Sequence, residues 1–332
     1  MSARVLVTGA SGFIGSYLTR RLLSDDIPVR VLVRNPGKLP PDVRERVEVI
    51  RGDIANPRMA ALMSHATEDV HTVYHLAACA RAWSRDPNEF RRANVDAVKA
   101  LLEAAERHEV TRLVHVSTVL TLKPHRPAPV QGSAAQPTPY ESTKSEGERL
   151  VESYAAAGRH AVIVHPTRVF GPGPLNDANG VTRAIALYVA GRLRVRLADH
   201  DVQANYVHAD DVAQGILSAA ERGRNGTHYV LGGENASFRE FLAIVAEIAN
   251  VRRLTVPLPR GVAMSVARIA ETWARIGGTA PITRGWIRIF LEDRRVDIEP
   301  ARRDLGYKPR SLRDGLAGTI RWLEGKHKET AA

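Results

Sequence analysis

The chain has 332 residues, 44% of them hydrophobic and 25% charged, with a formal net charge of +11 at pH 7. This composition is typical of a soluble globular protein with one large α/β domain and a smaller one, and no apolar run approaches the roughly 20 residues that span a bilayer. The single cysteine, Cys79, excludes an internal disulfide framework and fits a reducing cytoplasm, while scattered histidines without ligand spacing predict no metal site. Arginines spread along the chain favour a solvated basic surface over binding to nucleic acid or to an anionic membrane surface.

The first predicted element is a buried strand that leads through a glycine-rich turn into a helix. Residues 4–8 are apolar and open the chain, so we expect no secretory signal, and residues 16–23 have a helical pattern. A turn between strand and helix places backbone N–H groups and a helix N-terminus against a pyrophosphate. Such a pyrophosphate belongs to a dinucleotide cofactor, and the residues expected to contact it are Gly9, Ser11, Gly12, Phe13, Ile14 and Gly15.

The turn reads TGASGFIG, with the spacing GxxGxxG in place of GxGxxG. In this it resembles the extended short-chain dehydrogenase/reductases, and the resemblance continues through nearly the whole chain. It implies an α/β fold with a Rossmann doubly wound parallel sheet in residues 1–170, to which 201–232 contribute returning elements. Residues 171–200 and 233–325 are expected to form a smaller C-terminal α/β substrate-binding lobe.

A second buried strand is predicted at residues 29–33, and it ends at Arg34. A carboxylate about 20 positions after the glycine turn accepts the ribose 2′-hydroxyl of NAD, whereas arginine accommodates the 2′-phosphate of NADP. The next carboxylate here is Asp42. We therefore expect NADP(H) as the preferred cofactor, with NAD(H) as the alternative, and Lys38 as a second phosphate contact.

A third strand is predicted at residues 47–50. The resemblance implies that Asp53 and Ile54, which follow it, line the adenine pocket; alternatively, Asp53 caps the next helix. The fourth strand, from residue 72, ends in Leu76, Ala77 and Ala78, and the resemblance places these residues at the cofactor.

His75, within the apolar fourth strand, is interpreted as a core histidine. The following loop, residues 79–88, carries Trp83 and is a candidate substrate wall. A long helix is predicted at residues 88–107, and the resemblance implies that its Asn94 supports the active-site backbone.

The fifth strand, residues 113–118, ends in Ser117 and Thr118, where ligands bind in open α/β sheets. Tyr140 and Lys144 follow on a helix, and their spacing of four places them on one face. The resemblance identifies them as the YxxxK pair, with Thr118 in place of the usual serine and Ser117 beside it. The predicted catalytic residues are Thr118, Tyr140 and Lys144; Ser117, Tyr140 and Lys144 are also expected to contact the cofactor.

A tyrosine beside a lysine, as at Tyr140 and Lys144, indicates proton transfer. A tyrosine with its usual pKa of about 10 is a poor base at neutral pH, and a nearby ammonium and an oxidised nicotinamide would lower that pKa. Tyr140 would then exchange a proton with an alcohol or carbonyl while hydride moves to or from the nicotinamide. Thr118 would orient the substrate oxygen.

A further strand begins at residue 162, and the resemblance places Pro166 beside the nicotinamide. In the motif NYVHADDVA, Asp210 or Asp211 is expected to be a helix N-cap. This motif and YVLGGEN are similar to dihydroflavonol-reductase-like enzymes and hopanoid-associated sugar epimerases. Nucleotide-sugar epimerases carry an arginine where this chain has Asn205, so Asn205 is a candidate substrate contact that weakens the sugar-nucleotide interpretation.

Residues 257–295 include a helix with an apolar face and with arginines on its other face. It is expected to pack on the substrate lobe, with a lid or membrane contact as the alternatives. The sequence thus predicts a cytoplasmic NADP(H)-dependent oxidoreductase for a carbonyl/alcohol pair. An NAD-dependent sugar epimerase or dehydratase is the first alternative and a non-catalytic NADP(H)-binding regulator the second. By analogy we expect a homodimer.

Overall fold

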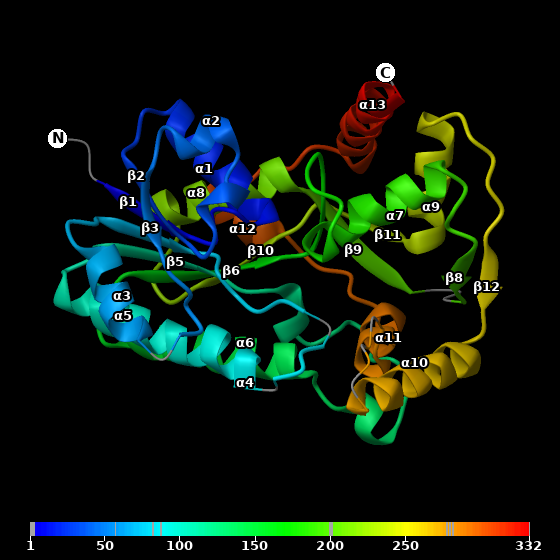
Figure 1. The fold of residues 1–332 in the computed structure, drawn as a ribbon, viewed down its shortest axis with the longest axis horizontal. Helices are drawn as coiled ribbons and strands as arrows, with labels where there is room; N and C mark the ends of the chain where they lie inside the picture. The colour runs from blue at the N-terminus through cyan, green and yellow to red at the C-terminus, as the bar shows by residue number, and fades with distance from the viewer. Residues whose placement is uncertain are drawn as a thin grey trace.

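The computed structural model describes residues 4–56, 58–81, 83–86, 88–198, 202–276, 278, 280 and 282–331. Its centre is a seven-stranded sheet in the order β3-β2-β1-β4-β5-β6-β10, with every neighbouring pair parallel (Figure 1). The strands are β1 (Val5–Thr8), β2 (Val29–Val33), β3 (Glu48–Arg51), β4 (Thr72–His75), β5 (Arg112–Val116), β6 (Ala161–Pro166) and β10 (His228–Leu231). The predicted Rossmann doubly wound fold is confirmed.

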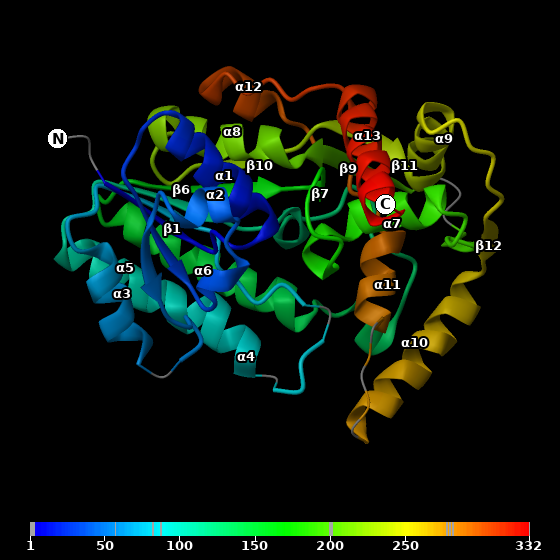
Figure 2. The same cartoon turned by 45° about the horizontal axis from the view of Figure 1, so that its top comes forward.

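Helices cover both faces of this sheet because its strands are apolar on both sides. In β1, Val5 and Val7 pack into one core cluster and Leu6 into the other. One face carries α1 (Phe13–Ser24), α8 (Ala209–Arg222) and α12 (Glu299–Leu305), and the other α3 (Met59–Thr67), α5 (Ala97–Arg107) and α6 (Pro139–Ala156) (Figure 2). The short helix α2 (Pro41–Arg44) lies beside α1.

Two helices differ from the prediction. α1 begins at Phe13, three residues early, because Gly12 already serves as its N-cap. The helix predicted at 88–107 is interrupted: α4 (Asn88–Arg91) and α5 are joined by a π-helical turn, Arg92–Asp96. Such turns are frequent at functional sites, and this one contains Asn94.

A second layer lies beside the carboxyl ends of the main strands (Figure 1). β7 (Arg168–Phe170), β9 (Gln203–His208) and β11 (Glu234–Ser237) form a three-stranded sheet, and β8 (Val195–Leu197) pairs with β12 (Val256–Leu258). Thus, within 201–232, β10 joins the main sheet and α8 packs on it, whereas β9 belongs to this second layer. Its helices are α7 (Gly180–Val189), α9 (Phe238–Ile248), α10 (Arg260–Arg275), α11 (Arg284–Leu291) and α13 (Leu312–Ala331).

The start of α8 corrects one expectation. The N-cap is His208, whose Nδ1 accepts from Asp210 N at 3.2 Å, so neither aspartate caps the helix. Asp210 instead pairs with Arg21 of α1, and both aspartates pair with Arg310. The first pair joins α1 to α8, and the pairs with Arg310 join α8 to the segment before α13. No described helix is long and apolar enough to cross a membrane.

We predict that Gly15→Ala destabilises the protein by about 2–4 kcal/mol, the range of severe packing defects, because its Cβ would lie 2.2 Å from the Gly9 carbonyl oxygen. The matched control is Gly318→Ala in α13, whose Cβ meets nothing within 4 Å, and which should be neutral or stabilising by up to about 1 kcal/mol. Urea unfolding measures both changes, and equal stabilities of the two variants would contradict the close helix–strand contact.

Candidate active site

The glycine turn follows β1 and lies beside the exit of β4, at the point where the strand order reverses. Gly9 has a φ of +77°, and a Cβ there would lie 2.8 Å from Ala77 N, so the position requires glycine. Gly12 is exposed, and the N-terminus of α1 has no side-chain cap and no carboxylate in its first turn. Unsatisfied N–H groups and the positive end of the helix dipole fit a phosphate. The turn therefore fits the predicted pyrophosphate.

Other residues of the turn divide between core and surface. Phe13 is buried and Ile14 partly buried against the core, while Ser11 and Gly12 open onto a cleft of about 620 Å³. Lys38 lines the same cleft.

The end of β2 carries an exposed cation, Arg34, whose guanidinium lies 3.9 Å from the Asp53 carboxylate. Asp53 Oδ1 also accepts from Ala55 N at 2.9 Å. The alternative role of Asp53 as a helix cap is wrong, because α3 begins at Met59 with Arg58 in the N-cap position. Ile54 is buried.

The exit of β4 is tied to β1 by backbone and side-chain bonds. Leu76 N donates to Thr8 O at 3.1 Å, and Ala77 N to Thr8 Oγ1 at 3.2 Å. Ala77 and Ala78 are partly buried. The exit of β4 is therefore held directly beside the glycine turn.

Asn94 holds the next residues. Its Oδ1 accepts from Cys79 N at 2.8 Å, and its Nδ2 donates to Cys79 O and Thr143 Oγ1. It thus ties the exit of β4 to the helix of Tyr140, the supporting role that the resemblance implied.

Thr118 and Tyr140 meet, as predicted. The Tyr140 phenol makes a side-chain hydrogen bond with Thr118. Thr118 ends the extended run of β5, and Tyr140 lies in the first turn of α6, which Thr138 and Glu141 start with a reciprocal capping box.

Lys144 lies one turn further and is buried. Its Nζ donates to Val116 O at 2.9 Å and lies 3.2 Å from His115 Nε2. His115 must then accept at Nε2, which leaves the proton on Nδ1. Lys144 is thereby fixed beneath the end of β5, on the helix face that carries Tyr140.

The pKa values differ from the simplest expectation. Burial raises the pKa of Tyr140 to about 12, against the opposing effect of its hydrogen bond with Thr118. Burial lowers the pKa of Lys144 to about 8, and the charge of Glu148 counteracts this. Lys144 is not among the groups that shift the Tyr140 pKa in the protein alone, so the phenol keeps its proton at neutral pH. The lowering by Lys144 and an oxidised nicotinamide together stays a prediction.

Ser117 points away from this pair, since its hydroxyl donates to the buried Glu148 carboxylate. Pro166 ends β6 and is buried. Trp83 is partly buried in the segment between β4 and α4.

Asn205 is buried and fully bonded. Its Oδ1 accepts from Thr167 and Gly233 N, and its Nδ2 donates to Gly233 O and Asn235. The amide therefore has no bonding capacity left for a substrate, and it ties β9 to the turn after β10.

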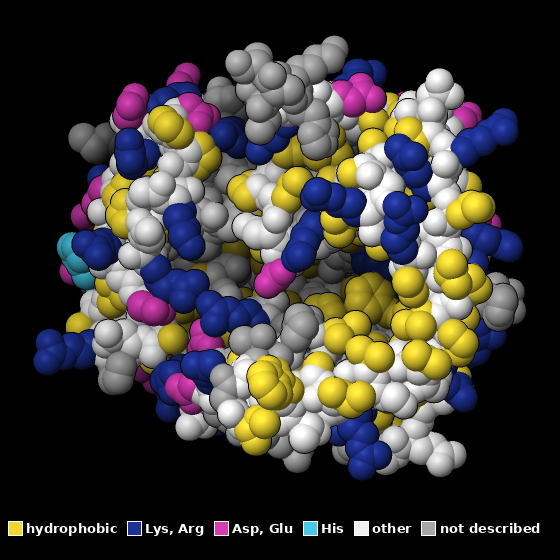
Figure 3. All heavy atoms as spheres, turned by 45° about the vertical axis from the view of Figure 1, so that its right-hand side comes forward, with side chains coloured by type: hydrophobic (Ala, Val, Ile, Leu, Met, Phe, Trp, Pro, Cys, Tyr) yellow, Lys and Arg dark blue, Asp and Glu magenta, His cyan; other side chains and the backbone are white. Residues whose placement is uncertain are grey.

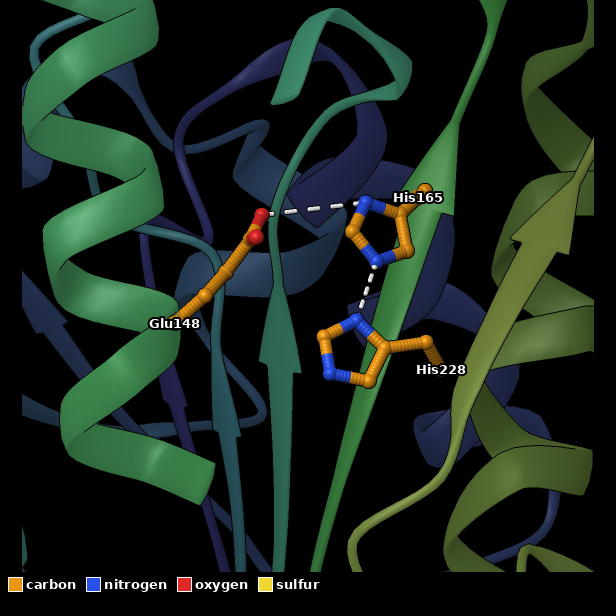
Figure 4. A group of neighbouring side chains, drawn as sticks. All are labelled: Glu148, His165 and His228. Carbon is orange, nitrogen blue, oxygen red and sulfur yellow. Dashed lines mark hydrogen bonds and ion pairs between the residues drawn. The ribbon is translucent and has the colours of Figure 1, made fainter. Parts of the chain in front are cut away.

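Sequence reasoning missed a chain of polar groups behind Thr118 (Figure 4). His165 Nδ1 lies 3.0 Å from Thr118 O and 3.7 Å from Glu148, and its Nε2 lies 2.9 Å from His228 Nδ1. His228 Nε2 in turn lies 3.0 Å from Glu152. Each ring nitrogen of His228 therefore has one polar neighbour, His165 on one side and Glu152 on the other.

Glu148, His165 and His228 offer ligand atoms within 4.8 Å of one another. Figure 4 shows, however, that Glu148 and His228 approach opposite nitrogens of His165. One ion cannot contact all three in this arrangement, so we interpret the group as a hydrogen-bonded chain. Only the histidine before Pro166 hinted at it; the pairing of β6 with β10 supplies His228.

A second missed feature is a buried ion network behind α6. Arg288 of α11 pairs with Glu141 and Glu292, and Glu292 pairs with Arg294. Arg294 Nη1 also donates to Val119 O and Leu122 O, both at 3.0 Å. The network therefore fixes the start of α6 and the turn after Thr118 from the second layer.

Comparisons with known proteins agree with this geometry. Residues 5–232 match the model of the NAD dependent epimerase/dehydratase family. A 4-hydroxy-2-methyl-3-oxo-4-farnesyl-3,4-dihydroquinoline-1-oxide ketoreductase of Stigmatella aurantiaca is 29% identical over 92% of either chain. The 2-alkyl-3-oxoalkanoate reductase of Stenotrophomonas maltophilia is 29% identical over 94% of this chain and 97% of the relative. The crystal structure of gox2253 superposes with a TM-score of 0.79 at 29% identity, covering 98% and 99% of the two chains.

A Rossmann sheet with a phosphate-binding turn and a YxxxK helix defines a nicotinamide-dependent enzyme of the short-chain dehydrogenase type. The chain belongs to the NAD-dependent epimerase/dehydratase family, among the extended short-chain dehydrogenase/reductases.

We predict a loss of stability in mild acid from buried neutral histidines. Burial lowers the pKa of His75 to about 3 and that of His208 to about 4. Below pH 6.5 the unfolded chain binds protons at these positions and the native state does not, so the free energy of unfolding falls by up to about 1.4 kcal/mol per pH unit for each proton.

His208→Asn keeps an N-cap acceptor and removes one titrating group. Urea unfolding between pH 7 and 5 should show a smaller slope for this variant than for the unmodified protein. Equal slopes would contradict the assignment of a neutral buried His208.

Proposed function

We propose that the protein reduces a ketone or aldehyde with NADPH, with Tyr140 as the proton donor. The observation that carries this proposal is the Tyr140 phenol, which is hydrogen-bonded to Thr118 and has its pKa raised to about 12 by burial. A group that keeps its proton at neutral pH is suited to donate it to a carbonyl oxygen.

The residues of the site divide the work. Bound at the glycine turn, NADPH would supply the hydride. Thr118 and Tyr140 would hold the carbonyl oxygen between two hydroxyls, and Tyr140 would protonate it as the alcohol forms. The buried cation Lys144 would stabilise the phenolate left behind and bind the nicotinamide ribose, the ligand its place in the family motif implies.

Two features support net reduction over sugar epimerisation. Arg34 and Lys38 place positive charge at the end of β2, where a 2′-phosphate would lie. Asn205 offers no clamp for a substrate diphosphate, because all four of its bonds are internal. The two relatives described above are named reductases of ketone substrates.

Tyr140→Phe should lower the rate of NADPH oxidation with a carbonyl substrate by about 10²–10⁴-fold, the usual contribution of a general acid. NADPH binding should stay within about threefold, a difference below 1 kcal/mol. A panel of β-keto esters and alkyl ketones, followed at 340 nm, provides the assay. Unchanged turnover would exclude Tyr140 as the acid, and cofactor binding without any turnover by the unmodified protein would favour the regulator.

Arg34→Glu should weaken NADPH binding by at least about tenfold, or 1.4 kcal/mol, because it replaces a phosphate partner by a carboxylate. NADH binding should change much less. Fluorescence titration measures both, and Arg149→Glu, the same charge change at an exposed position of α6, is the control. NADH binding tenfold tighter than NADPH binding to the unmodified protein would contradict the cofactor proposal.

A further inference from the structure

The outer face of α10 carries large apolar side chains in solvent. Val262 and Val266 are about half exposed, at 49% and 50%, and Ile269, Trp273 and Ile276 reach 70%, 61% and 74%. Their spacing of four and three residues aligns them along one side of the helix. We call these five residues the apolar stripe.

The helix is packed through its opposite side. Ala263, Ala267 and Ala274 are buried, and the first two belong to a core cluster with Ile287 and Leu291 of α11. The sequence led us to expect that the apolar face, small and large residues together, would pack on the lobe; in the structure its alanines do so, while Val262, Val266, Ile269 and Trp273 stay exposed. A surface helix ordinarily buries its large apolar residues, whereas here the five residues of the stripe remain about half or more exposed in the described chain.

The strands that precede α10 carry further exposed apolar residues. Leu254, just before β12, is 93% exposed, and Val256, the first residue of β12, is 65% exposed. Val195 of β8 pairs with Val256. Of the ten large hydrophobic residues exposed in the described chain, all but Leu175 and Phe290 lie in the apolar stripe, in β8 or at residues 254–256. Figure 3, in which this end of the molecule is turned forward, shows hydrophobic side chains gathered and bordered by arginine and lysine. An apolar patch of this kind marks an interaction site.

The charge of the segment selects the partner. Residues 250–274 contain Arg252, Arg253, Arg260 and Arg268 but only one acidic residue, Glu271. Glu271 is already paired with Arg284 at 2.8 Å. Two copies meeting through this surface would bring these arginines together, whereas an anionic lipid surface would neutralise them.

We propose that the apolar stripe binds the surface of an anionic lipid bilayer, with α10 in the plane of the interface. An amphipathic helix with aromatic and aliphatic residues on one face and basic residues on its polar face binds membranes in this way. The proposal does not depend on the reaction. It would nevertheless bring the bilayer close to the site, because α10 packs on α11, and Arg288 of α11 pairs with Glu141 next to Tyr140.

The test is co-flotation of the full chain with vesicles of phosphatidylcholine alone or with 30 mol% phosphatidylglycerol, an anionic fraction of about one lipid in three. The protein should float with the anionic vesicles and less at raised salt. Ile269→Glu should reduce the bound fraction about tenfold, because it places a carboxylate in the apolar stripe. Leu175→Glu, the same change at an exposed position outside the surface, should bind as the unmodified protein does.

Thermal melts would confirm that both variants fold, and a blue shift of fluorescence that Trp273→Phe reduces would place the stripe in the lipid. Failure to float with anionic vesicles, or equal binding of Ile269→Glu, would overturn the proposal. A dimer that Ile269→Glu dissociates, observed by sedimentation velocity without vesicle binding, would show that a second copy covers the stripe instead.

Discussion

The buried ammonium of Lys144 is the constraint on which the site depends. It is almost completely out of solvent, and within the described chain its hydrogen-bond partners are one backbone carbonyl, Val116 O, and one neutral ring, His115. Moving an ammonium into such surroundings costs free energy unless it is bonded, and the lowered pKa of Lys144 records that cost. Glu148, one turn further along α6, supplies the balancing negative charge. Its carboxylate accepts from Ser117 and lies 3.7 Å from His165, which in turn contacts His228.

The end of β5 is held by hydrogen bonds from both sides of the site. Thr118 is fixed through its carbonyl by His165 on one side, and the turn after it is fixed by Arg294 on the other. Buried ion pairs such as Glu141–Arg288 contribute little net stability, because desolvation offsets their attraction. Their effect here is to hold the start of α6 and the end of β5 in one geometry, which a proton donor and its neighbouring hydroxyl require.

The sequence predicted the parts of the site that local patterns encode. The apolar strand, the glycine spacing and a tyrosine four residues before a lysine each depend on neighbours in sequence, and the structure brings Thr118, Tyr140 and Lys144 to one region. It did not predict contacts made across the fold. His228 reaches His165 only because β10 pairs with β6, and Arg288 reaches Glu141 from 147 residues away.

Two expectations, the cap of α8 and the packing of α10, failed because a local pattern does not show which distant residues a side chain meets. Asp210 and Asp211 have the residue type of a helix cap, yet distant Arg21 and Arg310 engage them and His208 takes the cap. The amphipathic pattern of α10 identified a helix but not which side faces the protein, because buried alanines and exposed large residues share one apolar period. Burial also decided the tyrosine pKa, which spacing alone had suggested would fall.

The most direct test of this account is the ionisation of Tyr140 itself. The absorbance at 295 nm of the unmodified protein minus that of Tyr140→Phe, titrated with pH, isolates this phenol. The account predicts no ionisation below about pH 10, the usual tyrosine pKa, in the protein alone, and a marked lowering of that pKa when NADP⁺ binds above Lys144. Ionisation near neutrality in the protein alone, or a titration that NADP⁺ leaves unchanged, would contradict it.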